Sequence, residues 1–185
     1  MSEMRVSIDS SALNPVFTQP PTAITGMIYT TLIEDVTGVV AANNFLSIFN
    51  PLGSGKSLVI AQFTCFPYAT AAAAPTVNMD VFRTSAASAG TLLAAANISK
   101  FDTTQANSIA EVRTGNPTVT TVGTVPVVAV PPAITAAAGG VSSTVIIVPP
   151  SGALFLVRPG EGIVARTASG SVGQKWSLGF SWSEI

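Results

Sequence analysis

The fold is decided near the end of the chain, by the stretch KWSLGFSW at residues 175–182. Trp176, Leu178, Phe180 and Trp182 alternate there with small or polar residues. Successive side chains of a β-strand point to opposite faces, so this period of two predicts a strand with one apolar face. Each aromatic ring on that face can bury about 150 to 250 Å². We therefore expect a sheet that packs on one side against a second layer.

Residues 57–66 (SLVIAQFTCF) carry a different strand pattern. Strict alternation places Phe63 and Cys65 on one face and Leu58 and Ile60 on the other, so both faces are largely apolar. A strand that is apolar on both faces is typical of a central position in a sandwich.

Other segments add strands around these two. Residues 76–83 alternate, with Val77, Met79 and Val81 expected to point inward. Further strands are predicted from β-branched and apolar residues at 27–34, 44–49, 119–130, 141–148, 154–157 and 163–166. About eight or nine short strands separated by Gly and Pro predict an all-β chain folded as an antiparallel β-sandwich. Several connections are too long for simple hairpins, which favours jelly-roll or Greek-key topology.

Two segments do not fit the strand pattern. Residues 84–113 are rich in Ala and Ser, and are expected to form a long surface connection with a short helical turn at 108–113. Residues 1–25 are polar and contain prolines, which predicts an extended N-terminal arm. The expected organisation is this arm followed by a single sandwich domain over residues 26–185.

The composition argues against several classes of function. The 185 residues include no His, which is the commonest general base and metal ligand, and one Cys, which permits neither an intrachain disulfide nor a cysteine-based zinc site. Eight Lys and Arg against nine Asp and Glu provide no basic field for nucleic acid. Charged residues make up 9% of the chain, against about 25% in an average globular protein. We expect no enzyme, no cofactor and no metal, but a scaffold whose surface is covered by neighbours.

Local motifs have ordinary interpretations. The sequence GSGKS at 53–57 ends like a phosphate-binding loop, but Asn50 stands where that motif requires Gly, and a strand follows instead of a helix. Glu34 and Asp35 are adjacent, so in a strand they point to opposite faces and form no acid–base pair. Cys65, on an apolar strand, is predicted to be a small buried hydrophobe.

No targeting or membrane segment is predicted. Residues 1–10 carry charges and no apolar run, so we expect neither a secretory signal nor a transit peptide, and synthesis in the cytoplasm. The uncharged stretches 36–55, 57–79 and 114–157 are interrupted by Pro, Gly and polar residues, whereas a spanning helix needs about 20 mostly apolar residues.

The chain resembles the small β-sandwich head proteins of tailed bacteriophages that decorate or cement the capsid. The resemblance rests on four phrases in this order: FLSIFNPLGSGKSLVIAQF (45–63), VFRTSAASAGTLL (81–93), KFDTTQANSIAEVRTG (100–115) and LFLVRPGEGIVAR (154–166). It covers the chain from about residue 45 to the C-terminus.

The resemblance implies a virion structural protein, made in the host cytoplasm, that binds the outer capsid surface at capsomer junctions and stabilises the head. Its partners would be the major capsid protein and further copies of itself, commonly as a homotrimer; we expect no nucleic-acid or membrane partner. Several copies docking together would hold firmly through modest contacts. The candidate interface residues come from the arm and the first strand: Phe17, Pro20, Pro21, Met27 and Tyr29.

The alternative function is an adhesin of a phage fibre or head that binds host-surface glycans. Its support is Trp176 and Trp182, whose rings would stack on sugars if they were exposed. Sandwich core is the favoured interpretation of both rings, and Trp182, close to the chain end, is the one expected to be partly exposed.

Overall fold

Two antiparallel sheets make up the fold in the computed structural model, which describes residues 27–39, 41–69, 77–130, 145–147, 155–172 and 174–185. The strands of the first sheet are β1 (Met27–Thr37), β3 (Leu58–Ala69), β6 (Ser99–Lys100), β10 (Val145–Ile147), β11 (Phe155–Val157) and β13 (Gln174–Glu184). The strands of the second sheet are β2 (Asn43–Phe49), β4 (Met79–Ser88), β5 (Thr91–Leu92), β7 (Glu111–Thr114), β8 (Thr118–Val122), β9 (Val128–Val130) and β12 (Gly162–Thr167). A turn of 3-10 helix, η1 (Ala95–Asn97), joins β5 to β6. The predicted all-β sandwich is confirmed.

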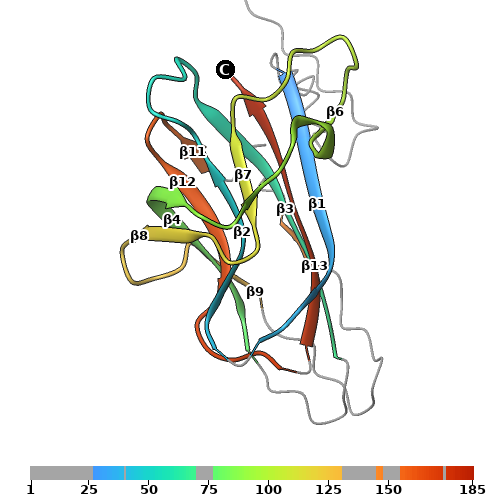
Figure 1. The fold of residues 1–185 in the computed structure, drawn as a ribbon, viewed down its shortest axis with the longest axis vertical. Helices are drawn as coiled ribbons and strands as arrows, with labels where there is room; N and C mark the ends of the chain where they lie inside the picture. The colour runs from blue at the N-terminus through green and yellow to red at the C-terminus, as the bar shows by residue number, and fades with distance from the viewer. Residues whose placement is uncertain (1–26, 40, 70–76, 131–144, 148–154, 173) are drawn as a thin grey trace, which may run out of the picture.

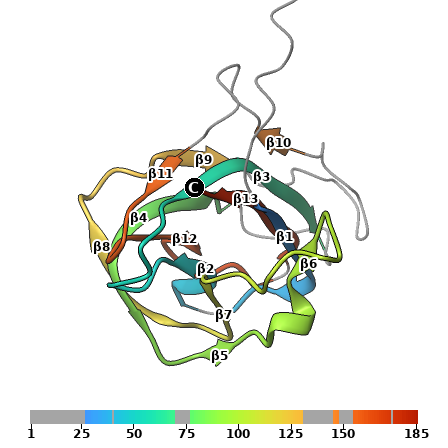
Figure 2. The same ribbon diagram turned by 90° about the horizontal axis from the view of Figure 1, so that it is seen from above.

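The strand pairings are nested, which means that the first strand pairs with the last, the second with the one before it, and so on inward. β1 pairs with β13, β2 with β12, β3 with β10 and β11, and β4 with β8 and β9, all antiparallel. The first sheet has the order β10-β3-β13-β1-β6, and the second has the order β5-β7-β2-β12-β4-β8. Figure 2 shows the two layers curving around a common interior. Nested pairing of this kind is jelly-roll topology, one of the two that the long connections predict.

Strand β13 supplies the centre of the core. Trp176, Leu178, Phe180 and Trp182 are each exposed by 1% or less, as their alternation predicts. Three aromatic contacts tie them to other strands: Phe45–Trp176 with ring centroids 5.2 Å apart, Phe63–Phe180 at 4.8 Å, and Tyr29–Trp182 at 5.8 Å. The aromatic face of β13 therefore joins β1 and β3 of its own sheet to β2 of the opposite one.

A β-bulge changes the predicted faces of β3. Leu58 and Ile60 lie in the same core cluster as Phe63 and Cys65, and none of the four is exposed. The register of β3 against β13 shifts by one residue at Ala61, which is extra in β3. An extra residue on one strand resets the faces of the residues beyond it, so both apolar sets turn toward the core.

The prediction for residues 84–113 is wrong. That segment contains β5, η1, β6 and β7, and Glu111–Thr114 is a strand where a helical turn was expected. Val112 pairs with Ile48 on β2 and is fully buried. Burial of an apolar side chain in a sheet outweighs the helix propensity of the neighbouring residues. Figure 1 shows β6 beside β1 and β7 beside β2, with which they pair.

A two-stranded ribbon covers the outer face of the second sheet. It consists of the last part of β4 paired with β8, and it leads from the β4 edge to β5 and β7 at the opposite edge (Figures 1 and 2). Asn44 on β2 holds its far end, because the Asn44 backbone N–H donates to Asn116 Oδ1 at 3.1 Å and its Nδ2 donates to the Pro117 carbonyl at 2.8 Å. Ser47 and Val164 are fully buried, although they lie on the side of the sheet away from the core.

Replacing Phe180 by Ala is expected to lower the free energy of unfolding by about 3–5 kcal/mol, because it leaves a cavity at the centre of the core. The control is Leu32→Ala on neighbouring β1, where the side chain is 51% exposed and the expected loss is below about 1 kcal/mol. Urea unfolding followed by the fluorescence of the buried tryptophans measures both variants. Equal losses would contradict the central position of Phe180.

Candidate functional site

Two of the five residues predicted to form a protein interface, Met27 and Tyr29, are among the described residues. Phe17, Pro20 and Pro21 are outside the described residues. Met27 begins β1, and its backbone pairs with that of Glu184. Tyr29 is fully buried, with its ring stacked on Trp182 and its hydroxyl donating to the Ala106 carbonyl at 2.9 Å. The prediction for Tyr29 is wrong, because its side chain is part of the core and offers no surface to a partner.

The predicted sugar platform is not on the surface. Trp176 and Trp182 are both 0% exposed, so the expectation that Trp182 is partly exposed is wrong. Each ring packs against another aromatic ring inside the sandwich, Trp176 on Phe45 and Trp182 on Tyr29. No face of either indole is available to a sugar, and the favoured core interpretation of both rings is confirmed.

The core face of β13 ends in a carboxylate that sequence reasoning missed. Glu184 continues the period of two after Trp182, and its side chain is completely buried. It accepts hydrogen bonds from Ser108 Oγ at 2.6 Å and from the Ile109 N–H at 2.9 Å, and Lys56 Nζ lies 3.5 Å away. Extending the alternation of residues 175–182 by two positions would have placed Glu184 among the inward residues. A buried carboxylate is stable only where donors of this kind surround it.

Side chains from three strands hold the loop that covers this end of the core, residues 101–110. Lys100 Nζ donates to the Gln105 carbonyl at 2.8 Å, Tyr29 Oη donates to the Ala106 carbonyl, and Glu184 receives the bonds already described. Burial, and after it the charge of Glu184, raise the pKa of the Tyr29 hydroxyl, which keeps it a donor. The loop is therefore fixed although it contains no helix or strand of its own.

Asp102 shapes the tip of this loop. Its Oδ1 accepts from the Thr104 N–H at 2.9 Å and from Thr104 Oγ1 at 2.7 Å. These two hydrogen bonds, the backbone one first, lower the pKa of the Asp102 carboxyl. Asp102 thus stabilises a tight turn, and its Oδ1 accepts hydrogen bonds from the backbone and side chain of that same turn.

The other carboxylates of the described residues do not converge. Asp35 lies at the bulge of β1 with a φ of 59°, and it pairs with Lys175 at 3.5 Å. Asp80 lies opposite Arg166 on β12. The pKa of the Asp80 carboxyl is raised, because burial outweighs the opposing effect of the Arg166 guanidinium. Within the described part of the chain, no three His, Cys, Asp or Glu side chains are placed to hold a metal ion. No helix among the described residues has the length and apolarity to cross a membrane.

The outer face of the first sheet is an uncharged surface. We define this face by the outward residues of its three longest strands: Ile28, Thr30 and Leu32 of β1, Val59, Gln62, Thr64 and Phe66 of β3, and Ser177, Gly179, Ser181 and Ser183 of β13. Charges occur at one margin, at Glu34 and Lys175. No described strand crosses this face, in contrast to the second sheet.

Two pairs of polar side chains on this outer face bond to each other, whereas Ser183 Oγ is buried without a hydrogen-bond partner in the described part of the chain. Ser181 Oγ donates to Thr30 Oγ1 at 3.1 Å, and Gln62 Nε2 donates to Thr64 Oγ1 at 2.8 Å. Leu32 is half exposed beside Gly179, whose missing side chain keeps the face flat. Removing water from these four paired side chains costs less than removing it from unpaired groups. The face thus combines exposed apolar area at Leu32 with two pairs of hydrogen-bonded side chains.

Replacing Glu184 by Ala is expected to lower the free energy of unfolding by about 1–3 kcal/mol, because Ser108 and the Ile109 amide lose their acceptor. Hydrogen exchange of the Ile109 amide should speed up more than that of amides in β13. The control is Glu161→Gln, which weakens a surface ion pair with Arg83 at 3.9 Å and should change stability by less than about 1 kcal/mol. A loop whose exchange is unchanged in Glu184→Ala would show that it is held by other contacts.

Cys65 is expected to be unreactive in the folded protein. Burial raises the pKa of the thiol to about 12, and the thiolate is the form that attacks iodoacetamide. Modification at pH 8 should be slow until urea unfolds the chain. The folded thiol keeps its proton more tightly than the unfolded thiol, whose pKa is 9.0. Its contribution to stability is therefore present below pH 9 and is lost as the pH rises toward 12, a dependence that Cys65→Ala should lack.

The structure thus offers an uncharged outer face on the first sheet and a fixed loop over the end of the core. The predicted tryptophan platform lies inside the sandwich, and the predicted arm residues Phe17, Pro20 and Pro21 are outside the described ranges. Comparisons of the chain with protein-family models, with curated proteins and with solved structures find no match.

Proposed function

We propose that this protein is a structural component of a phage virion, which binds the outer surface of the capsid at capsomer junctions and stabilises the head. The observation that carries the proposal is the uncharged outer face of the first sheet. The four phrases that resemble capsid decoration proteins support it. The jelly roll is also a fold of viral capsid and lectin domains, which adds an analogy at the level of the fold.

The chemistry of the outer face matches that of protein interfaces. The centres of such interfaces are depleted in charged residues, and this face has its charges only at one margin. Leu32 supplies exposed apolar area, and the neighbouring hydroxyls of Thr30 and Ser181 are already hydrogen-bonded. A partner that covers this face therefore gains apolar contact and does not bury an unpaired charge.

The proposed partners are the major capsid protein and further copies of this chain, in a homotrimer on the outside of a virion assembled in the host cytoplasm. A trimer presents three copies of the outer face at once. Once the first copy has docked, the second and third bind at high effective concentration, so modest contacts give a firm attachment. Closed cyclic symmetry is the common form of soluble homo-oligomers. Light scattering should then give about three times the 18.8 kDa of one chain.

Leu32→Glu is expected to weaken binding to purified undecorated heads by more than tenfold, because docking would bury an unpaired charge. The matched control is Val125→Glu, at a position that is 76% exposed between β8 and β9 of the other sheet. Co-sedimentation with heads measures both variants, and light scattering shows whether each keeps its oligomeric state. Equal affinities for the two variants would contradict docking through the first sheet.

The arm is a second part of the same proposal. Residues 1–25, with Phe17, Pro20 and Pro21, would lie along a neighbouring subunit or add a strand to its sheet. Deleting them and repeating the co-sedimentation tests this role. Unchanged affinity would remove the arm from the interface and leave the outer face as the docking surface.

A further inference from the structure

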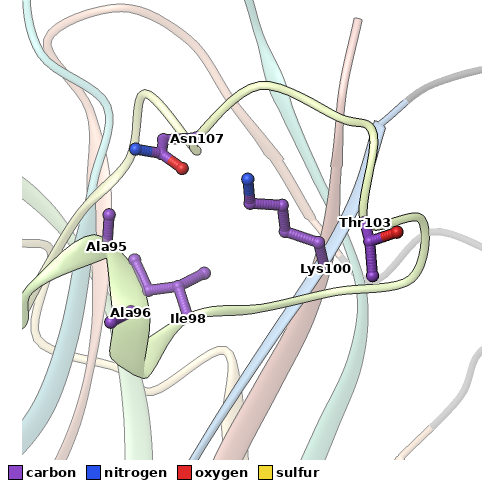
Figure 3. Close-up of a pocket in the computed structure, with 6 residues that line it drawn as sticks. All are labelled: Ala95, Ala96, Ile98, Lys100, Thr103 and Asn107. Atoms are coloured by element: carbon purple, nitrogen blue, oxygen red, sulfur yellow. The ribbon is translucent and has the colours of Figure 1, made fainter.

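A hollow of about 470 Å³ lies where η1, β6 and the loop of residues 101–110 meet. It is lined by Ala95, Ala96, Ile98, Lys100, Thr103 and Asn107 (Figure 3). The alanines, Thr103 and Asn107 are exposed, so the hollow is open to solvent and admits one unit of a longer chain.

Lys100 provides the charge in this hollow. Its ammonium group points into the space in Figure 3, and it donates one hydrogen bond to the Gln105 carbonyl at 2.8 Å. An ammonium group has three donors, so two remain for a ligand. In the described part of the chain, Lys56 and Lys175 each pair with a carboxylate, whereas Lys100 has no carboxylate partner. The site therefore favours an anion.

The remaining lining groups select the rest of the ligand. Asn107 presents an amide, which both donates and accepts, across the hollow from the Lys100 ammonium group, whereas the Thr103 hydroxyl points away from the space in Figure 3. Ala95, Ala96 and Ile98 lie together on the same side of the hollow as Asn107 and form an apolar wall. A ligand that suits this arrangement has one carboxylate, a hydroxyl group beside it and a compact C–H surface.

The hollow is held in shape before any ligand arrives. Thr103 and Asn107 belong to the loop that Tyr29, Lys100 and Glu184 hold by hydrogen bonds. Asp102 fixes the turn that carries Thr103. A site with its side chains already positioned avoids the entropy loss of ordering a flexible loop.

We propose that this hollow binds an acidic sugar, with the carboxylate on Lys100, a ring hydroxyl on Asn107, and the C–H face of the ring on the alanines. The site lies apart from the buried tryptophans and does not depend on the role proposed for the outer face. Because the hollow is open to solvent, it can hold one sugar residue while the rest of a polysaccharide continues outside it. A free metabolite would be better held by an enclosed cavity.

D-Glucuronate and D-glucose are the probes, because they differ by the carboxylate that Lys100 would bind. Each is titrated at millimolar concentration into the full-length ¹⁵N-labelled protein while amide chemical shifts are recorded. Glucuronate should shift the amides of residues 95–107, and glucose should bind at least tenfold more weakly, because a hydrogen bond to a charged group is worth about one order of magnitude or more. Acetate, which has the carboxylate without the ring, should also bind more weakly.

Lys100→Gln should weaken glucuronate binding by tenfold or more, and Asn107→Ala should weaken it to a smaller extent. The matched control is Lys175→Gln on β13. Lys175 pairs with the last residue of β1, whereas Lys100 pairs near its first, so this variant removes the same charge far from the hollow and should leave the affinity unchanged. The spectrum of each variant shows directly whether it is folded. Absence of shifts at residues 95–107, equal binding of glucose or acetate, or full affinity in Lys100→Gln would each overturn the proposal.

Discussion

The rest of the structure depends on the burial of one aromatic face, that of β13. This strand pairs with β1 along one side and with β3 along the other, and its inward rings contact Tyr29, Phe63 and Phe45. Because the pairings are nested, the outermost pair joins the first described strand to the last one. The core is therefore closed by contacts between residues far apart in the sequence, which is the kind of topology that folds slowly.

The two sheets differ in how their outer faces are treated, and this difference bears on function. The second sheet is covered by the ribbon of β4 and β8, which buries Ser47 and Val164 on the side away from the core. The first sheet presents short hydroxyl side chains, Gly179 and the half-exposed Leu32. A chain with 9% charged residues has few charges to place on such a face. It is the face on which a partner surface would find apolar area beside the hydrogen-bonded hydroxyls of Thr30 and Ser181.

Sequence reasoning predicted the sandwich and failed where tertiary contacts override local patterns. The alternation from Trp176 to Trp182 was sufficient to predict the core face, since a period of two has one structural meaning. The bulge at Ala61 carries no sequence signal, so the faces of β3 were predicted incorrectly. Strand β7 was missed because the residues around Val112 have a helical preference that burial overrides. Tyr29 was assigned to the surface because strand periodicity does not show which face meets the second sheet.

The loop over the end of the core and the hollow beside it both belong to one segment of the chain, the one between β4 and β8. The segment between β4 and β8 adds β7 to the second sheet and β6 to the first, so it must cross from one layer to the other. The loop of residues 101–110 makes this crossing and contains no helix or strand. Ordering such a loop costs conformational entropy, which hydrogen bonds from other elements must offset. Glu184, Tyr29 and Lys100 supply those bonds from the strands beneath. The buried carboxylate at the end of β13 is thus explained by the crossing, and the hollow beside Lys100 is the space that the crossing leaves between η1 and the loop.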